Sequence, residues 1–276
     1  MWKALKYILI YFAFQLLGAV VVLIPGYIMD ADEAVILVIA LAVANLLFCL
    51  YIFRKNRIRL DKQSFTIRPW TILLLSVIAV FFFILPEVEL IERLDLPNNL
   101  GDELDDVGGT FLGLISIGIL GPISEELLFR GAVLGSLLEW RPIRSMPWIA
   151  ILLSATLFGL VHMNPAQMPG AFAIGLLYGW LAYRTGSLLP GIVGHIFNNS
   201  LVCILEMFPE EEGSPETVAE MFDSPFLEFL AVAASLIVCI VVVKTIARIV
   251  NEHYPHPAFS MVSDDMAHPG QEFIEE

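Results

Sequence analysis

Long apolar stretches separated by short polar segments run along most of this chain. A bilayer core about 30 Å thick is crossed by about 20 apolar residues in a helix, and most of the stretches approach or exceed that length. We therefore predict an all-α, polytopic membrane protein with about eight transmembrane helices that enclose an intramembrane cavity. The predicted spans are Leu5–Ile28, Ala34–Phe53, Trp70–Leu85, Gly109–Leu138, Trp148–His162, Gly170–Tyr183, Leu188–Phe208 and Phe226–Val243.

The charged residues between these stretches predict the side that each loop faces. If alternate loops are cytoplasmic, they hold all but two of the 15 Lys and Arg residues, the exceptions being Arg93 and Arg130. Cytoplasmic loops carry such an excess, and the five Trp residues fall near span ends on the same side, where indole rings favour the interface. We predict that both termini are cytoplasmic, in the plasma membrane if the protein is prokaryotic.

Composition excludes one class of partner. The chain is 58% hydrophobic and only 16% charged, with 29 acidic against 15 basic residues and a net charge of −14. Nucleic-acid binding needs a face rich in Lys and Arg, so no nucleic-acid partner is expected, whereas membrane lipids are. Cys49, Cys203 and Cys239 lie in apolar runs without the spacing of a zinc or disulfide motif.

The chain divides into four predicted parts. Residues 1–108 form three spans and their loops, and residues 109–208 form a core that holds most of the polar residues inside spans. Residues 209–250 form an acidic loop and the last span. Residues 251–276, rich in acidic residues and proline, are predicted to be a disordered acidic cytoplasmic tail.

The most informative residues are ionisable and lie inside the fourth span. A charged group at the centre of a bilayer costs about 2.5–3.5 kcal/mol on insertion scales, so it is retained only where something compensates. Glu126 and Arg130 are four residues apart and can pair on one helix face. Glu125 points about 100° away from Glu126 and has no such partner on its own helix.

Two further spans each carry one histidine. In the fifth span Phe158 precedes His162 by four residues, and in the seventh His195 precedes Asn199 by four, with Asn198 adjacent. At about 1.5 Å of rise per residue, Glu125 lies about 24 Å from the end of its long helix. On the same scale His162 lies about 22 Å from Pro147, and His195 lies about 12 Å from Ser187. These depths allow all three side chains to share one cavity that leans towards the cytoplasm.

Such a set of side chains is able to hydrolyse an acyl bond without a nucleophilic side chain. A sequestered carboxylate takes a proton from water, one His shares that task or protonates a leaving amine, and the other His with Asn199 stabilises an oxyanion. Ser124 lacks the Gly-x-Ser-x-Gly frame of a serine nucleophile. Glu125, His162 and His195 also match a zinc set of two His and one Glu, so these residues leave metal dependence open.

Structural roles are the competing interpretation for every one of these residues. Glu126 with Arg130 is then an internal ion pair, and the His and Asn residues are interhelical hydrogen-bonding groups. A non-enzymatic immunity or scaffold protein, or a proton-coupled carrier, would use the same residues. A carrier is expected to show inverted repeats and broken helices, which the sequence does not show.

The ordered motifs resemble those of the type II CAAX prenyl endopeptidases, the CAAX-protease and bacteriocin-processing (Abi) family of intramembrane proteases. The shared pattern lies between about Gly109 and Phe208. It consists of Glu125-Glu126-x-x-x-Arg130, then Phe158-x-x-x-His162, then His195-x-x-x-Asn199.

The resemblance implies an intramembrane endopeptidase that acts on a membrane-anchored protein or peptide, prenylated in some members. It implies that Glu125 activates water with help from His162, that His195 and Asn199 stabilise the oxyanion, and that Glu126 and Arg130 shape the site. It favours a glutamate-dependent site that requires no cofactor, with zinc on Glu125, His162 and His195 as the alternative. Phe158 and Asn198 are expected to support the site.

Overall fold

The computed structural model describes residues 1–54, 60, 62–99, 107–208, 215, 217–222 and 224–258, and the regular secondary structure of these residues is entirely helical. The predicted tail from residue 259 to 276 lies outside the described residues. The long helices outside the middle of the chain are α1 (Trp2–Ile28), α2 (Glu33–Arg54), α3 (Thr71–Arg93), α8 (Pro147–Val161), α9 (Met168–Thr185), α10 (Leu189–Glu206) and α11 (Pro225–His253).

The fourth helical segment, Phe111–Leu138, is continuous but irregular, and we call it the central helix. Two π-helical segments interrupt its α-helical geometry. In order it consists of α5 (Phe111–Gly113), π-helical η2 (Leu114–Leu120), α6 (Gly121–Glu126), π-helical η3 (Leu127–Val133) and α7 (Leu134–Leu138). Two single 3₁₀ turns, η1 (Gln63–Phe65) and η4 (Arg141–Ile143), lie in connections between the long helices.

A proline follows directly after the first π-helical segment and removes a backbone donor there. Pro122 has no N–H for either carbonyl that a helical residue there would contact, those of Gly118 and Ile117. Side chains from α10 supply donors instead. Ser200 Oγ donates to Gly118 O at 3.1 Å and Asn199 Nδ2 donates to Ile117 O at 3.3 Å. The irregular helix is therefore fastened to α10 at the level where it would otherwise lose backbone bonds.

A helix lies at each of the eight predicted span positions. Six of them are long and apolar enough to cross a membrane: α1, α2, α3, the central helix, α10 and α11. The chain is thus a multi-pass membrane protein. The other two helices differ from the expectation, because α8 has only 15 residues and α9 is not among the six. Half of the residues of α9 are buried. At such positions small side chains let neighbouring helices approach closely, which large apolar side chains would prevent.

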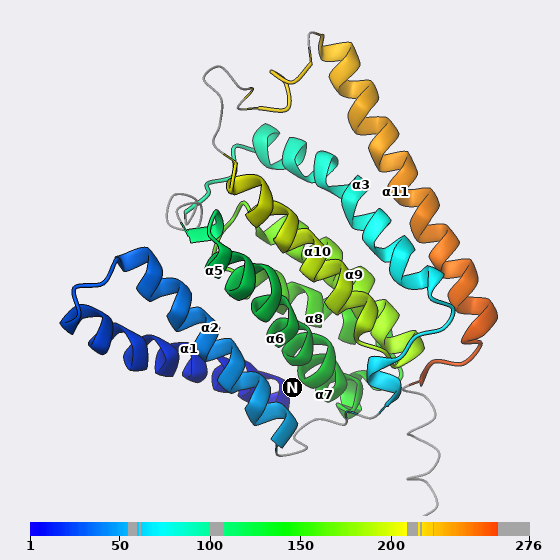
Figure 1. Cartoon of the computed structure of the whole chain (residues 1–276). Coiled ribbons are helices and arrows are strands. Elements are labelled where there is room, and N and C mark those ends of the chain that lie inside the picture. The colour runs from blue at the N-terminus through cyan, green and yellow to red at the C-terminus, as the bar shows by residue number, and fades with distance from the viewer. Residues whose placement is uncertain are drawn as a thin grey trace, which may run out of the picture.

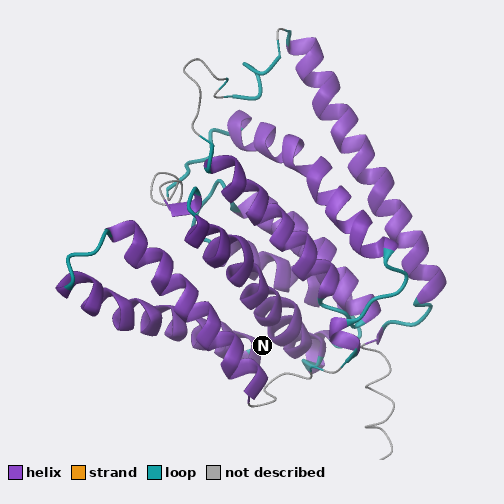
Figure 2. Ribbon diagram, viewed as in Figure 1, coloured by secondary structure: helices purple, strands orange, loops and turns teal. Residues whose placement is uncertain are grey.

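The helices form three groups that lie side by side (Figure 1). The hairpin of α1 and α2 covers one side of the molecule, and the pair α3 and α11 covers the other. Between them lie the central helix, α8, α9 and α10, and the same arrangement is clear in Figure 2. The helices of the middle group lie between Phe111 and Glu206.

Glycine brings α8 and α9 together, as small residues in spans predict. A Cβ atom added to Gly175 would lie 3.2 Å from Ala155 Cα, and one added to Gly179 would lie 3.3 Å from the Ile151 side chain. These contacts are tighter than nearly all real Cβ contacts. The short α8 is therefore held against α9 by backbone approach rather than by large side chains.

An ion-pair network joins the remaining pair, α3 and α11. Arg93, the basic residue that the sequence places on the acidic side, contacts Glu89 one turn earlier, and its Nη2 lies 2.7 Å from Glu228 Oε1. Both carboxylates are almost fully buried, whereas the guanidinium is largely exposed. At the other end of α11, Tyr254 is bonded on both sides. Its carbonyl accepts from Arg184 Nη2 at 2.7 Å, and its hydroxyl accepts from the Arg68 backbone N–H at 3.1 Å.

Candidate functional site

Glu126 is the centre of the buried polar group that the central helix presents to α10. Its side chain is fully buried, and its Oε1 lies 2.8 Å from Arg130 Nη1, which confirms the pair predicted from their spacing. The same oxygen lies 3.2 Å from His195 Nδ1. Glu126 therefore neutralises the buried cation and also fixes the orientation of an imidazole from another helix.

His195 then presents its other ring nitrogen to the second carboxylate. When Nδ1–H donates to Glu126, the Nε2 atom faces outward from that pair. The Nε2 atom lies 3.8 Å from Glu125 Oε2, which is beyond hydrogen-bond distance but close enough for both atoms to contact one water molecule. The structure thus brings together Glu125 and His195, which are 70 positions apart in the chain.

Glu125 differs from Glu126 in the way the sequence predicts. Its side chain is about one-fifth exposed, whereas that of Glu126 is fully buried. Within the described residues, the buried Oε2 atom of Glu125 has no hydrogen-bond partner. The Oε2 atom of Glu126 also lacks a hydrogen-bond partner among the described residues, so the two carboxylates differ in that the Oε1 atom of Glu126 is held by a cation and an imidazole.

His162 lies at the C-terminal end of α8, where its ring is held by its own helix. Its Nδ1 atom lies 2.8 Å from the carbonyl oxygen of Phe158, so Nδ1 carries the proton and Nε2 is left as an acceptor. Among the described residues, no hydrogen bond or ion pair joins His162 to Glu125 or His195. The structure brings His162 to the site through Phe158 rather than by a direct polar contact.

The ring of Phe158 contacts three side chains of the site, those of Arg130, His162 and His195. The guanidinium carbon of Arg130 lies 4.2 Å from the centre of its ring, in a cation–π contact. The rings of His162 and His195 both meet it edge to face, with centroids 5.0 and 5.6 Å away. The supporting residue predicted from the motif thus contacts both histidines and the arginine.

Asn199 and Asn198 are bonded in a way that the sequence does not reveal. Asn199 Nδ2 donates to the carbonyl of Ile117 in the central helix, and Asn198 Nδ2 donates to Asn199 Oδ1 at 3.3 Å. One N–H of Asn199 is therefore engaged with backbone, while its second N–H is available to a ligand. The predicted oxyanion role of Asn199 requires this second N–H or a change of partner.

Sequence reasoning missed the residues that let α10 approach the buried pair. A Cβ atom at Gly191 would lie 2.4 Å from Glu126 Oε2, and one at Gly194 would lie 2.1 Å from the hydroxyl of Tyr178. A side chain at Gly191 would require a shift of α10 or of the Glu126 side chain, and one at Gly194 would require a shift of α10 or of Tyr178 in α9. The signal that could have found them is their position, because both precede His195 by about one helical turn or less.

The zinc alternative finds no preformed ligand set in the structure. The described part of the chain contains no group of three or more His, Cys, Asp or Glu side chains placed to hold a metal ion. The bond from His162 Nδ1–H to Phe158 O leaves Nε2 of that ring unengaged, and metal dependence stays a prediction. We therefore derive no reaction step through a metal.

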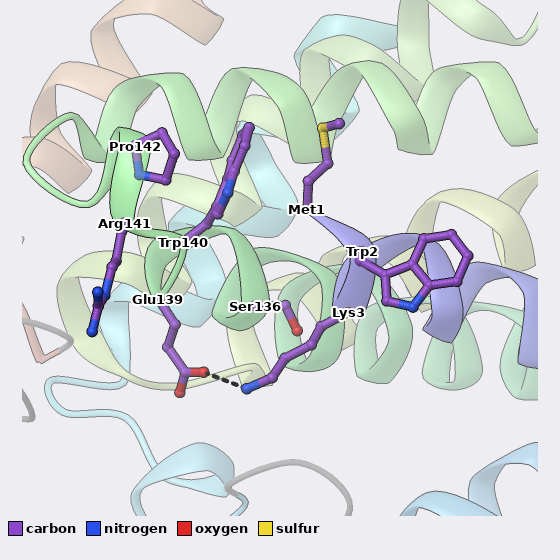
Figure 3. Close-up of a pocket in the computed structure, with 8 residues that line it drawn as sticks. All are labelled: Met1, Trp2, Lys3, Ser136, Glu139, Trp140, Arg141 and Pro142. Atoms are coloured by element: carbon purple, nitrogen blue, oxygen red, sulfur yellow. Dashed lines mark hydrogen bonds and ion pairs between the residues drawn. The ribbon is translucent and has the colours of Figure 1, made fainter.

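A groove of about 550 Å³ lies away from these residues, where the start of α1 meets the end of the central helix. Figure 3 shows Trp2 and Trp140 on its walls and the ion pair between Lys3 and Glu139, whose Nζ and Oε2 atoms are 3.4 Å apart. None of the predicted site residues lines it. The cavity that the sequence predicts around Glu125 stays a prediction.

Comparison with known proteins places the motif residues in one recognised domain. Residues 108–201 match the family described as "Type II CAAX prenyl endopeptidase Rce1-like". This segment is a domain of that family. It contains the central helix, α8, α9 and most of α10, and so includes every residue of the polar group around Glu126.

Two curated proteins are similar to part of the chain. The protein of Bacillus subtilis (strain 168) named "Putative membrane peptidase YdiL" is 31% identical over 106 residues, which cover 38% of this chain and 42% of that protein. An "Uncharacterized 24.3 kDa protein" of Escherichia coli is 28% identical over 131 residues, covering 46% of this chain and 59% of that protein. The chain thus spans about half the length of the curated relatives that it matches. No solved structure matches it significantly.

Proposed function

We propose that this protein is an intramembrane endopeptidase that hydrolyses a peptide bond in a membrane-anchored protein or peptide. The observation that carries the proposal is the placement of Glu125 Oε2, which lacks a hydrogen-bond partner among the described residues and lies 3.8 Å from His195 Nε2. A water molecule between these atoms would have a base on one side and a polar ring on the other. The peptidase family of residues 108–201 supports this interpretation.

The proposed reaction begins with a water molecule held by Glu125. Glu125 takes a proton from the water as its oxygen attacks the scissile carbonyl, whose oxygen becomes an oxyanion. The second N–H of Asn199 stabilises that oxyanion, together with His195 in its doubly protonated form, in which Nδ1–H donates to Glu126 and Nε2–H donates to the oxyanion. The C–N bond then breaks, and the proton held by Glu125 passes to the leaving amine, which returns Glu125 to its starting form.

His162 has an assisting role in this proposal. Its Nδ1–H bond to Phe158 O fixes the tautomer in which Nε2 accepts a proton or a hydrogen bond. An approaching substrate or water can therefore use Nε2 of His162 as a second acceptor. Arg130 acts through Glu126 and the ring of Phe158, and it does not contact the reacting atoms.

The membrane arrangement belongs to the same proposal. We infer that α8 and α9 complete eight spans together with the six longer helices and that the site opens in a cavity within the membrane. Both termini are then cytoplasmic, as the distribution of basic residues predicts. The substrate needs an anchor that brings its peptide bond to this depth, and a prenyl group at its C-terminal end is the anchor that the family name indicates.

Cleavage of a fluorogenic membrane-anchored peptide by the purified full-length protein tests the proposal. Glu125→Gln should abolish cleavage, because the amide cannot accept the proton of the attacking water. Glu139→Gln is the matched control, since Glu139 lies beyond the end of the same helix and pairs with Lys3. Equal cleavage by wild type and Glu125→Gln would refute the assignment and favour the non-enzymatic alternative.

Two further arms of the assay sharpen it. Prenylated and unprenylated forms of one peptide decide whether the lipid is recognised. Chelator treatment followed by zinc addition decides the metal question, with folding followed in the same samples. We expect activity to survive chelation, and loss of activity that zinc alone restores would contradict the metal-free mechanism.

A further inference from the structure

A second buried polar cluster joins α1 and α2 to α6, the piece of the central helix that carries Glu125. It consists of Tyr11 and Gln15 from α1, Asn45 from α2 and Ser124 from the central helix. Tyr11, Asn45 and Ser124 are buried. Three of the four residues lie outside the segment that matches the peptidase family, which begins at residue 108.

Asn45 is the hub of this cluster, because its side-chain oxygen accepts from all three neighbours. The distances to Asn45 Oδ1 are 2.8 Å from Ser124 Oγ, 2.9 Å from Gln15 Nε2 and 3.3 Å from the Tyr11 hydroxyl. Polar side chains within a membrane are expensive unless they bond to one another. A hub that joins two flanking helices to one residue of the central helix is therefore a specific arrangement.

The residue that Asn45 holds is adjacent to the proposed base. Ser124 directly precedes Glu125, and its hydroxyl also lies 2.9 Å from the carbonyl of Gly121, one turn earlier. Glu125 is thus approached by His195 from α10 and by the cluster from α1 and α2.

The backbone around Glu125 makes such support useful. Only six residues, Gly121–Glu126, are α-helical between the two π-helical segments η2 and η3. π-Helical segments are rarer and less regular than α-helix and often mark functional sites. The direction in which Glu125 points therefore depends on what fixes this short α-helical piece from the side.

We propose that Asn45 is a positioning residue for Glu125, which it holds towards His195 by fixing Ser124 and Tyr11. The inference rests on the proposed peptidase function and deepens it, because it makes the first two helices part of the working site. Asn45 does not contact the substrate. It acts through Ser124 and the backbone of Gly121–Glu126, and the bond from the Tyr11 hydroxyl ties α1 to the same side-chain oxygen.

The chain offers a matched control for the difference between positioning and simple helix attachment. Ser116, also in the central helix and fully buried, donates to the carbonyl of Val38 in α2 at 3.1 Å. This bond joins the same two helices as the Asn45–Ser124 bond but lies more than two turns away from Glu125. Removing it should loosen the attachment of the helices without changing the direction of Glu125.

Steady-state kinetics of the full-length protein test the proposal. Asn45→Ala should lower kcat about 10- to 100-fold, the effect of misplacing a catalytic group by about 1 Å, with KM changed less than about threefold. Ser124→Ala and Tyr11→Phe, which each delete one oxygen atom, should lower kcat by smaller factors. Ser116→Ala should retain kcat. The double variant Asn45→Ala with Ser124→Ala should be no slower than Asn45→Ala, because the two residues act in one chain.

A spectroscopic readout separates this inference from the proposed activity. The carboxyl infrared band that Glu125→Gln removes belongs to Glu125 whether or not the protein cleaves a peptide. Asn45→Ala and Ser124→Ala should shift that band, and Ser116→Ala should leave it in place. If wild type and Glu125→Gln cleave equally, the peptidase proposal fails and the band still reports whether Asn45 positions Glu125.

The proposal is overturned if folded Asn45→Ala keeps both the kcat and the Glu125 band of wild type. Should Asn45→Ala fail to fold, the two single-atom variants Ser124→Ala and Tyr11→Phe decide. Wild-type kcat and an unshifted band in both would overturn the proposal. Equal loss of kcat in Ser116→Ala and Ser124→Ala would likewise show that helix attachment, and not positioning, is what Asn45 provides.

Discussion

The central helix and α11 are both long enough to cross a membrane, yet they meet different surroundings. Half of the apolar stretch of the central helix is buried inside the protein, whereas only 6% of that of α11 is. The central helix carries two acids and an arginine between apolar residues, while the middle of α11 carries none. A helix that mainly faces lipid tolerates only apolar side chains, whereas a helix enclosed by others can hold ionised groups that pair. Matched substitutions in the central region and in α11 should therefore change stability and peptide cleavage by different amounts.

The largest contrast is expected for the two arginines. Replacing Arg130 by Met should leave the buried carboxylate of Glu126 without its cation, which costs about 3–5 kcal/mol when one partner of a buried pair is removed. Arg248→Met in α11 removes an exposed partner of Glu252, 3.9 Å away, and should not measurably change stability. Thermal unfolding in detergent measures both. Similar losses in the two variants would contradict the distinction between the regions.

Added volume should separate the two regions next. Gly191→Ala places a Cβ atom against Glu126 Oε2 and should cost about 1–3 kcal/mol, the usual penalty of overpacking. Peptide cleavage should fall with it, because α10 carries His195. Ala234→Leu adds more atoms to an exposed position of α11 and should be tolerated. If Gly191→Ala is as stable and active as wild type, the close approach of α10 is not required.

A smaller difference is expected for two phenylalanines. Phe158→Leu removes the ring under Arg130 and beside both histidines, and losing the cation–π contact should cost about 0.5–2 kcal/mol. Cleavage should fall because His162 and His195 lose their common wall. Phe229→Leu in α11 changes a largely exposed side chain and serves as the control. Unfolding temperature and kcat together would show whether the ring orients the site or only fills space.

The smallest effect concerns a hydrogen bond at the periphery. Ser235 Oγ in α11 donates to the carbonyl of Phe82 in α3 at 2.8 Å. Interhelical hydrogen bonds of this kind contribute about 0.6 kcal/mol on average in a membrane. Ser235→Ala should lower the unfolding temperature slightly and leave cleavage unchanged. A large loss of activity would show that α3 and α11 take part in the site, as α1 and α2 are proposed to do.

The positions of the helices could be predicted well from apolar length, because a helix that contacts lipid needs a continuous apolar stretch in its own sequence. The pairing of Glu126 with Arg130 was predictable for the same local reason, since four residues place them on one helix face. Two helices were less predictable as spans. α8 is apolar but has only 15 residues, and half of the residues of α9 are buried, many of them small, so neither helix has both the length and the hydropathy of a typical span.

The sequence alone therefore determined that the chain is helical, that it lies in a membrane, and which few polar residues need an explanation inside it. Only the tertiary structure decided which atoms meet. Glu126 bonds His195 across 69 positions, Ser124 bonds Asn45 across 79, and Asn199 bonds the backbone of Ile117 instead of remaining free. Hydropathy is a property of consecutive residues, whereas these contacts depend on how each helix is rotated and how closely glycine lets two helices approach.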